Sequence, residues 1–372
     1  MSDEKERAFP PSAALTEQQL LENEVRVQRL ADLLAGGQAL ALVGAGCSVS
    51  AGFPTWKQLL DKLAAVAEGL SGGFLARPVA DDLLEHAQAI RDSIVSAGGQ
   101  ERFDTELGRI FVRTPTLTPM HEDLVKLPFR GFITTNYDGT LEAALENGSG
   151  GPRPKPVPVW NGDPRYLDLV IRTLTEKPCR DYIIHLHGVC SDVLGEAYPR
   201  TIILTRKDYE EAYGITLPTS TTHVSDGNPH RLREVLSTLL STRRLVFIGF
   251  SLEDAFVNHV LFRSANLSWG WSEPAHFAIL PTSIETAAGD QDKARRLRND
   301  LLVESIFYEA KGSDHSELAL LVRRLADRFG EAILGPPSES SSLPPLPPPS
   351  PPRPAWVQSV NQAYRKKHDT GG

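Results

Sequence analysis

The sequence has few cysteines, and this scarcity excludes one common class of site. Of its 372 residues only three are cysteines, Cys47, Cys179 and Cys190, and none of them forms a Cys-x-x-Cys pair. Without such pairs the chain cannot build a four-cysteine zinc site by itself, so we expect no zinc and no other metal. A sparse and odd number of cysteines is also typical of a reducing compartment.

Long apolar runs and long basic runs are missing as well. No stretch approaches the ~18 apolar residues of a membrane-spanning helix, and the charged first residues lack the apolar core of a secretory signal. We therefore expect a cytoplasmic protein without membrane contact. The net charge of −8 and the lack of a basic run argue against direct nucleic-acid binding. With 41% hydrophobic residues, the chain can form a large core.

The stretch from residue 39 to residue 56 is the most informative one. An apolar run at 39–43 ends in a Gly-Ala-Gly-Cys-Ser turn at 44–48, and a helical pattern follows Pro54. A strand, a glycine-rich turn and a helix in this order present backbone N–H groups to a diphosphate, and Gly46 would let the backbone approach it. Val49 replaces the last glycine of the dehydrogenase fingerprint, and no P-loop lysine follows. Alone, the turn fits either a diphosphate site or a turn that binds nothing.

Short apolar strands alternate with helical patterns along the rest of the body. Strands are predicted at about 129–135, 181–188, 201–205, 244–251, 275–280 and 303–308. Helices are predicted at about 16–34, 139–145, 166–174, 206–213, 229–240, 254–264 and 316–329, with a Gly- and Pro-rich loop at 148–158. This alternation predicts an α/β fold with a Rossmann-like, mostly parallel sheet, whose ligands bind at the carboxyl ends of the strands.

The composition divides the chain into three parts. Residues 1–14 are predicted to be a disordered lead-in, 15–335 the α/β domain, and 336–372 a Pro-rich disordered tail. Helical insertions are predicted at about 57–127 and 190–242, and the first is either a lid over a cleft or extra packing. In the tail, Trp356, Val360 and Tyr364 are four apart and would share a helical face. That face either docks on a partner or belongs to an unstructured end.

Four motifs in one order carry a resemblance to a known family. They are the 44–48 turn with Gly-Phe-Pro-Thr-Trp at 52–56, Thr-Thr-Asn-Tyr-Asp at 134–138, His-Leu-His-Gly at 185–188 and Gly-Phe-Ser-Leu at 249–252. Over about residues 30–333 the chain resembles the sirtuin-like NAD-binding family. More narrowly, it is similar to the zinc-less bacterial sirtuin-like domains of antiphage defence systems. The resemblance implies that NAD+ is the substrate and that helical insertions replace the sirtuin zinc module.

The resemblance also implies roles for individual positions. Asn136 would be the catalytic asparagine at the nicotinamide ribose, and His187 would be the catalytic base. Asp138 would shape the same pocket. The other implied NAD-binding residues lie in the diphosphate turn, in the loop over the nicotinamide and on the adenosine side: Gly44, Ala45, Gly46, Ser48, Pro54, Trp56, Gly249 and Ser251.

These residue types suit cleavage of the bond between nicotinamide and ribose. The leaving group is already cationic in NAD+, so the site needs to orient the ribose and to place a nucleophile. Asn136 offers a donor and an acceptor, and a histidine such as His187 can take a proton near neutral pH. Each also fits a structural role when read alone. His185 is expected on the same strand face as His187, as a structural or supporting residue, and Cys47 is interpreted as filler in the turn.

The resemblance implies an NAD+ glycohydrolase that depletes NAD+ in abortive infection and releases nicotinamide and ADP-ribose. One alternative is NAD-dependent deacylation or ADP-ribosylation of protein, and another is a non-catalytic sensor of NAD+ or ADP-ribose. The missing cysteine pairs favour hydrolysis over deacylation, and the presence of both Asn136 and His187 favours an enzyme. A toxic hydrolase needs control, and the family implies a homo-oligomer or a regulatory partner such as a HerA-type ATPase or an Argonaute-like protein.

Overall fold

The computed structural model describes residues 14–71, 82–148, 157–160, 164–191, 198–200, 202–214, 231–267, 273–312 and 314–329. The predicted lead-in up to residue 13 and the predicted tail, with Trp356, Val360 and Tyr364, lie outside the described residues. None of the described helices is both long enough and apolar enough to cross a membrane.

Seven parallel strands form the central sheet, in the order β3-β4-β2-β1-β7-β8-β9. They are β1 (Ala39–Val43), β2 (Gly131–Thr134), β3 (Val157–Trp160), β4 (Tyr182–His185), β7 (Arg244–Ile248), β8 (His276–Thr282) and β9 (Val303–Glu309). Apart from the edge strand β3, this is the 3-2-1-4-5-6 order of Rossmann folds. The prediction of a Rossmann-like parallel sheet is confirmed, and the point where the strand order reverses lies at β1.

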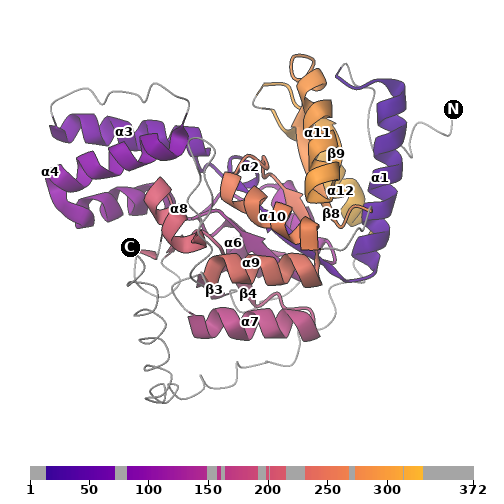
Figure 1. Cartoon of the computed structure of the whole chain (residues 1–372), viewed down its shortest axis with the longest axis horizontal. Helices are drawn as coiled ribbons and strands as arrows, with labels where there is room; N and C mark the ends of the chain where they lie inside the picture. Colours follow the sequence, from indigo (N-terminus) through magenta and orange to yellow (C-terminus); the bar gives the residue numbers. More distant parts are fainter. Residues whose placement is uncertain are drawn as a thin grey trace, which may run out of the picture. The chain divides into compact units, whose positions relative to one another are not determined.

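Helices pack on both faces of this sheet (Figure 1). They are α1 (Glu17–Ala35), α2 (Ala45–Ser48), α3 (Trp56–Ser71), α4 (Leu83–Phe111), α5 (Pro119–Lys126), α6 (Thr140–Asn147), α7 (Pro164–Glu176), α8 (Arg206–Tyr213), α9 (Arg231–Thr242), α10 (Ala255–Leu267), α11 (Ala287–Leu301) and α12 (Ser316–Phe329). Helices α7, α9, α10 and α11 contact one another in succession, as do α6, α5 and α12, so the sheet lies between two helical layers.

Helices α3 and α4 form a second apolar cluster beside the sheet (Figure 1). Its members include the fully buried Leu63, Ile90 and Leu107. Within α4 the backbone breaks at Gly99, where φ is +79°, a conformation that glycine adopts without strain. Helix α4 also contacts α8, and the Arg91 guanidinium lies 2.6 Å from an Asp208 carboxylate oxygen. The inserted helices are therefore joined to α8 by packing and by charge.

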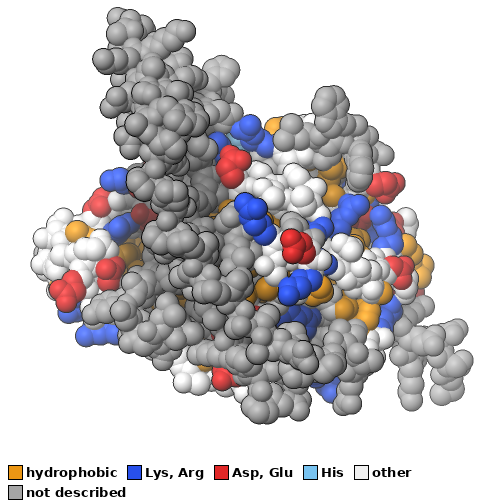
Figure 2. All heavy atoms as spheres, turned by 90° about the horizontal axis from the view of Figure 1, so that it is seen from below, with side chains coloured by type: hydrophobic (Ala, Val, Ile, Leu, Met, Phe, Trp, Pro, Cys, Tyr) orange, Lys and Arg blue, Asp and Glu red, His pale blue; other side chains and the backbone are white. Residues whose placement is uncertain are grey.

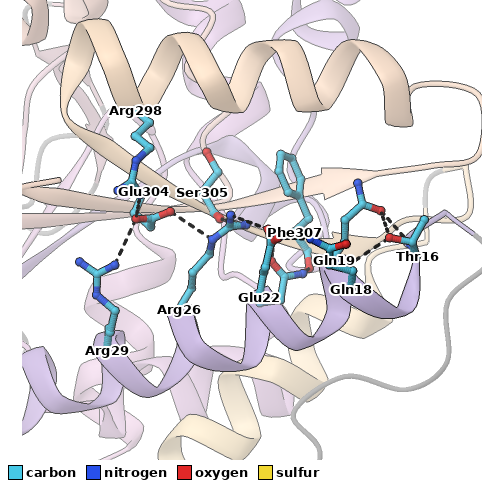
Figure 3. A network of polar contacts seen from close by, with 11 residues as sticks. Thr16, Gln18, Gln19, Glu22, Arg26, Arg29, Arg298, Glu304, Ser305 and Phe307 are labelled. Carbon is cyan, nitrogen blue, oxygen red and sulfur yellow. Dashed lines mark hydrogen bonds and ion pairs between the residues drawn. The ribbon is translucent and has the colours of Figure 1, made fainter. Parts of the chain in front are cut away.

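Helix α1 is fastened to strand β9 through buried polar groups (Figure 3). Glu304 on β9 is 2% exposed, and its carboxylate pairs with Arg26 at 3.1 Å, with Arg29 at 3.4 Å and with Arg298. Asn23 donates to the Phe307 carbonyl at 2.9 Å. The charge of Glu304 can be buried because three guanidinium groups surround it.

A capping box begins helix α1. The Thr16 hydroxyl accepts from the Gln19 backbone N–H, and the Gln19 side chain accepts from the Thr16 N–H at 2.7 Å. Local sequence thus sets where α1 starts, whereas the contacts with Glu304 and Phe307 set where it packs.

One predicted strand is wrong, and the last two residues of one predicted loop belong to a strand. Residues 202–204 form no strand; Ile203 makes a single backbone bond to the His187 carbonyl, at 3.0 Å. An antiparallel pair, β5 (Val189–Ser191) with β6 (Tyr198–Arg200), precedes this segment instead. The predicted loop at 148–158 overlaps strand β3, which begins at Val157. Pro158 lacks an N–H, which is tolerated because β3 is an edge strand.

The described part of the surface mixes both signs of charge. Figure 2 shows Lys and Arg side chains interspersed with Asp and Glu side chains on the described part of one face. Surface charge on that part of the face therefore does not point to a polyanionic ligand.

Candidate functional site

The polar residues of the four motifs follow strands that end at one level of the sheet. In the register of the sheet, Val43 at the end of β1 pairs with Thr134 of β2 and with Ile248 of β7, and Thr134 pairs with His185 of β4. The segments that follow these four residues therefore leave the sheet at the same edge. This edge, at the reversal of strand order, is where Rossmann folds bind ligands.

The glycine-rich turn after β1 packs directly against the turn after β7. The N–H groups of Gly44 and Gly46 donate to the carbonyls of Ile248 and Gly249, both at 2.9 Å. A Cβ on Gly44 would lie 2.5 Å from the Gly249 oxygen, and one on Gly46 would lie 2.9 Å from it. Glycine at these two positions thus allows the two turns to pack closely. The motif alone did not indicate this reason for the glycines. Gly249 itself has a φ of +63°.

Asn136 lies between this turn and strand β2. Its side-chain NH2 donates to the Gly44 carbonyl at 3.0 Å and to the Ser48 hydroxyl at 2.9 Å. The side-chain oxygen of this buried residue has no hydrogen-bond partner. A buried amide oxygen normally has a donor, so an unpaired one at a strand end is an acceptor that a donor from a ligand or a water would satisfy.

The backbone of Asn136 is also held from two sides. Its N–H donates to the Thr134 hydroxyl at 2.9 Å, and that hydroxyl donates to the Val43 carbonyl at 2.8 Å. The Asn136 carbonyl accepts from Nδ1 of His185 at 2.9 Å. The other ring nitrogen of His185, Nε2, lies 2.8 Å from the Glu142 carboxylate. Burial lowers the pKa of His185, but the charge and hydrogen bond of Glu142, together with the Asn136 carbonyl and the Asp138 charge, outweigh it, and the pKa is raised.

Asp138 lies in the same cluster as Asn136. Its carboxylate accepts from the Thr140 N–H at 3.0 Å and is hydrogen-bonded by the Ser48 side chain. Burial raises the pKa of Asp138, although the bonds from Thr140 and Ser48 oppose the rise. Ser48 therefore connects Asn136 and Asp138, as expected for residues of one pocket.

His187 belongs to a different cluster from His185. Its Nε2 lies 2.9 Å from the Tyr213 hydroxyl and its Nδ1 3.2 Å from the Tyr209 hydroxyl. Burial lowers the pKa of His187, against a weaker opposing effect of the Asp254 charge. Strand β4 ends at His185, so the alternation of side chains that would place both histidines on one face does not extend to His187. His185 supports Asn136, because its two ring nitrogens bond to the Asn136 carbonyl and to Glu142 and not to His187.

The other predicted residues differ in burial and in what they pack against. Trp56 is half-buried and packs against the α3–α4 cluster, and Pro54 and Ala45 are half-buried too. Ser251 is exposed on the segment after β7. Cys47 is buried, and burial raises the pKa of its thiol to about 12, so the thiol stays protonated and suits the predicted filler role. Within the described ranges, no group of three or more His, Cys, Asp and Glu residues could hold a metal ion.

Sequence analysis did not single out the residues that hold the two histidines. These are Glu142, Tyr209, Tyr213 and Asp254. Two signals were present: Tyr209 and Tyr213 are four apart on a predicted helix, and Asp254 stands where an N-cap is expected. Neither signal indicates a histidine as the partner, because the helices and His187 are brought together only by the fold.

Comparison with known proteins agrees with the motifs. Residues 130–306 match the family model described as SIR2-like domain. The chain is 25% identical over 263 residues to the NAD(+) hydrolase ThsA of Enterococcus faecium, covering 70% of this chain and 46% of the relative. It is 29% identical over 226 residues to the NAD(+) hydrolase ThsA of Bacillus cereus (strain MSX-D12), covering 60% of this chain and 39% of the relative. It is 23% identical over 248 residues to the defense-associated sirtuin 2 of Bacillus subtilis, covering 65% of this chain and 21% of the relative. The chain thus spans less than half the length of each of these relatives.

Proposed function

The chain carries a SIR2-like domain, and from this premise we propose that it is an NAD+ glycohydrolase that acts in antiphage defence. Relatives named as NAD(+) hydrolases and as a defence-associated sirtuin support the proposal. The observation that carries it is the unpaired side-chain oxygen of Asn136, held at the strand ends next to the glycine-rich turn.

The reaction needs one bond to break and one to form. The bond between the ribose C1′ and the nicotinamide nitrogen breaks, and its electron pair leaves with nicotinamide, which becomes neutral. The oxygen of a water molecule bonds to C1′ and gives ADP-ribose, and its proton goes to His187. Asn136, fixed through both amide hydrogens, uses its free oxygen to accept a hydrogen bond from that water or from a ribose hydroxyl.

The remaining residues bind the rest of the substrate in this proposal. The turn formed by Gly44, Ala45, Gly46 and Ser48 binds the diphosphate, and Asp138 shapes the ribose pocket. Gly249 and Ser251 lie toward the adenosine, and the segment with Pro54 and Trp56 covers the nicotinamide side. These assignments are supported by the convergence of the four strand ends on one edge of the sheet.

We further propose that the protein works in the cytoplasm as a controlled effector of abortive infection. Residues 15–335 would form the NAD-binding domain, with helical insertions at about 57–127 and 190–242. Self-assembly into a homo-oligomer, or a partner such as a HerA-type ATPase or an Argonaute-like protein, would hold the activity in check. A hydrolase that empties the cell of NAD+ needs such control.

The experiment that tests this function is product analysis with NAD+. We expect the activated full chain to release equal amounts of nicotinamide and ADP-ribose, and Asn136→Ala to release neither at a comparable rate. A parallel reaction with an acyl-lysine peptide and a protein acceptor separates the alternatives. Products that appear only with the peptide or acceptor would point to transfer onto protein. NAD+ binding without any nicotinamide release, in every assembly state tested, would point to a sensor.

A further inference from the structure

His187 is enclosed by aromatic side chains from two helices. Tyr209 and Tyr213 on α8 pack edge-on against its ring, with ring centroids 4.9 and 6.1 Å away. Phe256 on α10 packs against both tyrosines, at 4.9 and 5.7 Å. His187 and Tyr213 are 3% and 0% exposed. In a cluster this buried, each polar group takes its hydrogen-bond partner from the neighbouring side chains, so the direction of each bond follows from those partners.

The direction of the bonds can be followed from Asp254. Its Oδ1 accepts the backbone N–H groups of Phe256 and Val257, at 3.0 and 2.9 Å, which directs Oδ2 toward Tyr209. A carboxylate only accepts, so the Tyr209 hydroxyl donates to Oδ2, at 3.1 Å. With its one hydrogen used, the Tyr209 oxygen accepts from Nδ1 of His187. Nδ1 therefore carries the proton.

The other ring nitrogen follows from the same reasoning. A neutral imidazole with a proton on Nδ1 has its lone pair on Nε2, and the Tyr213 hydroxyl donates to it at 2.9 Å. Burial, which lowers the pKa of His187, supports the neutral ring. Burial and the Asp254 charge also raise the pKa of Tyr209, so its hydroxyl keeps its proton.

We propose that Asp254 and Tyr209 are positioning residues that hold His187 as the Nδ1–H tautomer, so that Nε2 is the atom that accepts the proton of the attacking water. The inference rests on the proposed hydrolase function and adds to it which ring nitrogen is the base. The proposal gives Tyr213 an inhibitory effect, because its hydroxyl donates to the Nε2 lone pair that must accept the water proton. Tyr213 must release Nε2 before His187 can act.

The test compares three substitutions in the full chain, with NAD+ as the substrate. Asp254→Asn keeps an oxygen for the two backbone N–H groups, so its NH2 faces Tyr209 and donates to it. Tyr209 then donates to Nδ1, and the tautomer of His187 is reversed. We expect nicotinamide release to fall at least about tenfold in Asp254→Asn and in Tyr209→Phe. We expect Tyr213→Phe to release nicotinamide faster than the parent.

A second measurement does not depend on activity. Long-range ¹H–¹⁵N NMR spectra distinguish a protonated ring nitrogen from an unprotonated one, and His187→Gln identifies the signals of this ring. We expect Nδ1–H in the parent and in Tyr213→Phe, and Nε2–H in Asp254→Asn. Tyr308→Phe is the matched control, because it removes a tyrosine–histidine hydrogen bond of 2.8 Å to His315. It should change neither the His187 signals nor the rate.

Two results would overturn the proposal. One is an Nδ1–H signal that persists in Asp254→Asn. The other is a loss of activity in Tyr213→Phe as large as that in Tyr209→Phe, which would mean that the cluster acts only by packing. If the parent releases no nicotinamide, the hydrolase function fails, whereas the NMR spectra still decide whether Asp254 and Tyr209 set the tautomer.

Discussion

His185 and His187 are two residues apart, yet they are held in opposite ways. His185 faces two acceptors, the Asn136 carbonyl and the Glu142 carboxylate, so both of its ring nitrogens can bond only as donors. His187 faces one acceptor and one donor, which suits a neutral ring with a single tautomer. The contacts of His185 therefore suit a charged ring that holds the Asn136 backbone, whereas those of His187 suit a neutral ring.

The two clusters also differ in what builds them. The Asn136 cluster consists of groups at the ends of β1, β2 and β4 and on α6, all tied into the sheet. The His187 cluster depends on side chains from α8 and α10, and α8 is joined to the inserted helix α4. His187 is therefore connected to the inserted helix α4 through α8.

The largest expected effect comes from removing one residue of each cluster. Asn136→Ala and His187→Ala should each slow nicotinamide release by at least about 100-fold, because one loses the positioned acceptor and the other the base. The double variant should lose far less than the product of the two, since both act on one step. Quenched assays of the activated protein measure this. A fully multiplicative loss would show that the two clusters act in separate steps.

The rigidity of the strand-end side can be measured with two matched glycines. Gly249 and Gly37 have φ values of +63° and +62°, but a Cβ on Gly249 would lie 2.6 Å from the Cys47 backbone, whereas one on Gly37 has no atom within 4 Å. Gly37→Ala should lower the free energy of unfolding by about 1–2 kcal/mol, because alanine is strained at this positive φ. Gly249→Ala should lower it by about 1–3 kcal/mol more, because its Cβ is also crowded. Equal costs in denaturant unfolding would mean that the two turns are not closely interlocked.

The opposite states of the two histidines should give opposite pH dependence of stability. The raised pKa of His185 contributes stability that is present below its ordinary pKa of about 6.5 and is lost as pH rises through the folded value. The lowered pKa of His187 contributes stability that is present above about 6.5 and is lost as pH falls through the folded value.

This difference can be read from denaturant unfolding at several pH values. The stability that the parent has over His185→Gln should shrink from acidic to alkaline pH, whereas its stability over His187→Gln should grow. If both differences change in the same direction, the two rings do not hold opposite charge states in the folded protein.

The smallest effect tests the connection between α4 and α8. Arg91→Met removes the ion pair with Asp208 and keeps an apolar side chain over the Phe103 ring, so α8 should be held less firmly. We expect a change of at most about threefold in nicotinamide release, because a partly exposed ion pair contributes little energy. Arg102→Met, which removes a pair with Glu106 on the same helix, is the control and should have no effect. If Arg102→Met changes nicotinamide release as much as Arg91→Met does, the ion pair between α4 and α8 does not influence His187.

Local sequence patterns predict many of the strands and helices of this fold. Continuous apolar strands such as 39–43 and 244–248 are recognisable because a parallel sheet buries both of its faces, and the Thr16 capping box marks a helix start by local bonds alone. Asn136 and Ser48 could be predicted to meet, because residues that follow parallel strands emerge at one edge. The strand at 157–160 was missed because its proline is tolerated only at an edge, and a sequence does not mark edges.

What only the tertiary structure decided is the state of each polar group. Gly46 reads in sequence as a place for a phosphate, and only the fold shows that the backbone of Gly249 also lies against it. His185 and His187 have the same side chain and lie in one motif, and they differ because the packing of α6, α8 and α10 gives them different partners. A sequence lists donors and acceptors, but a proton is placed only by the groups that the fold brings within about 3 Å.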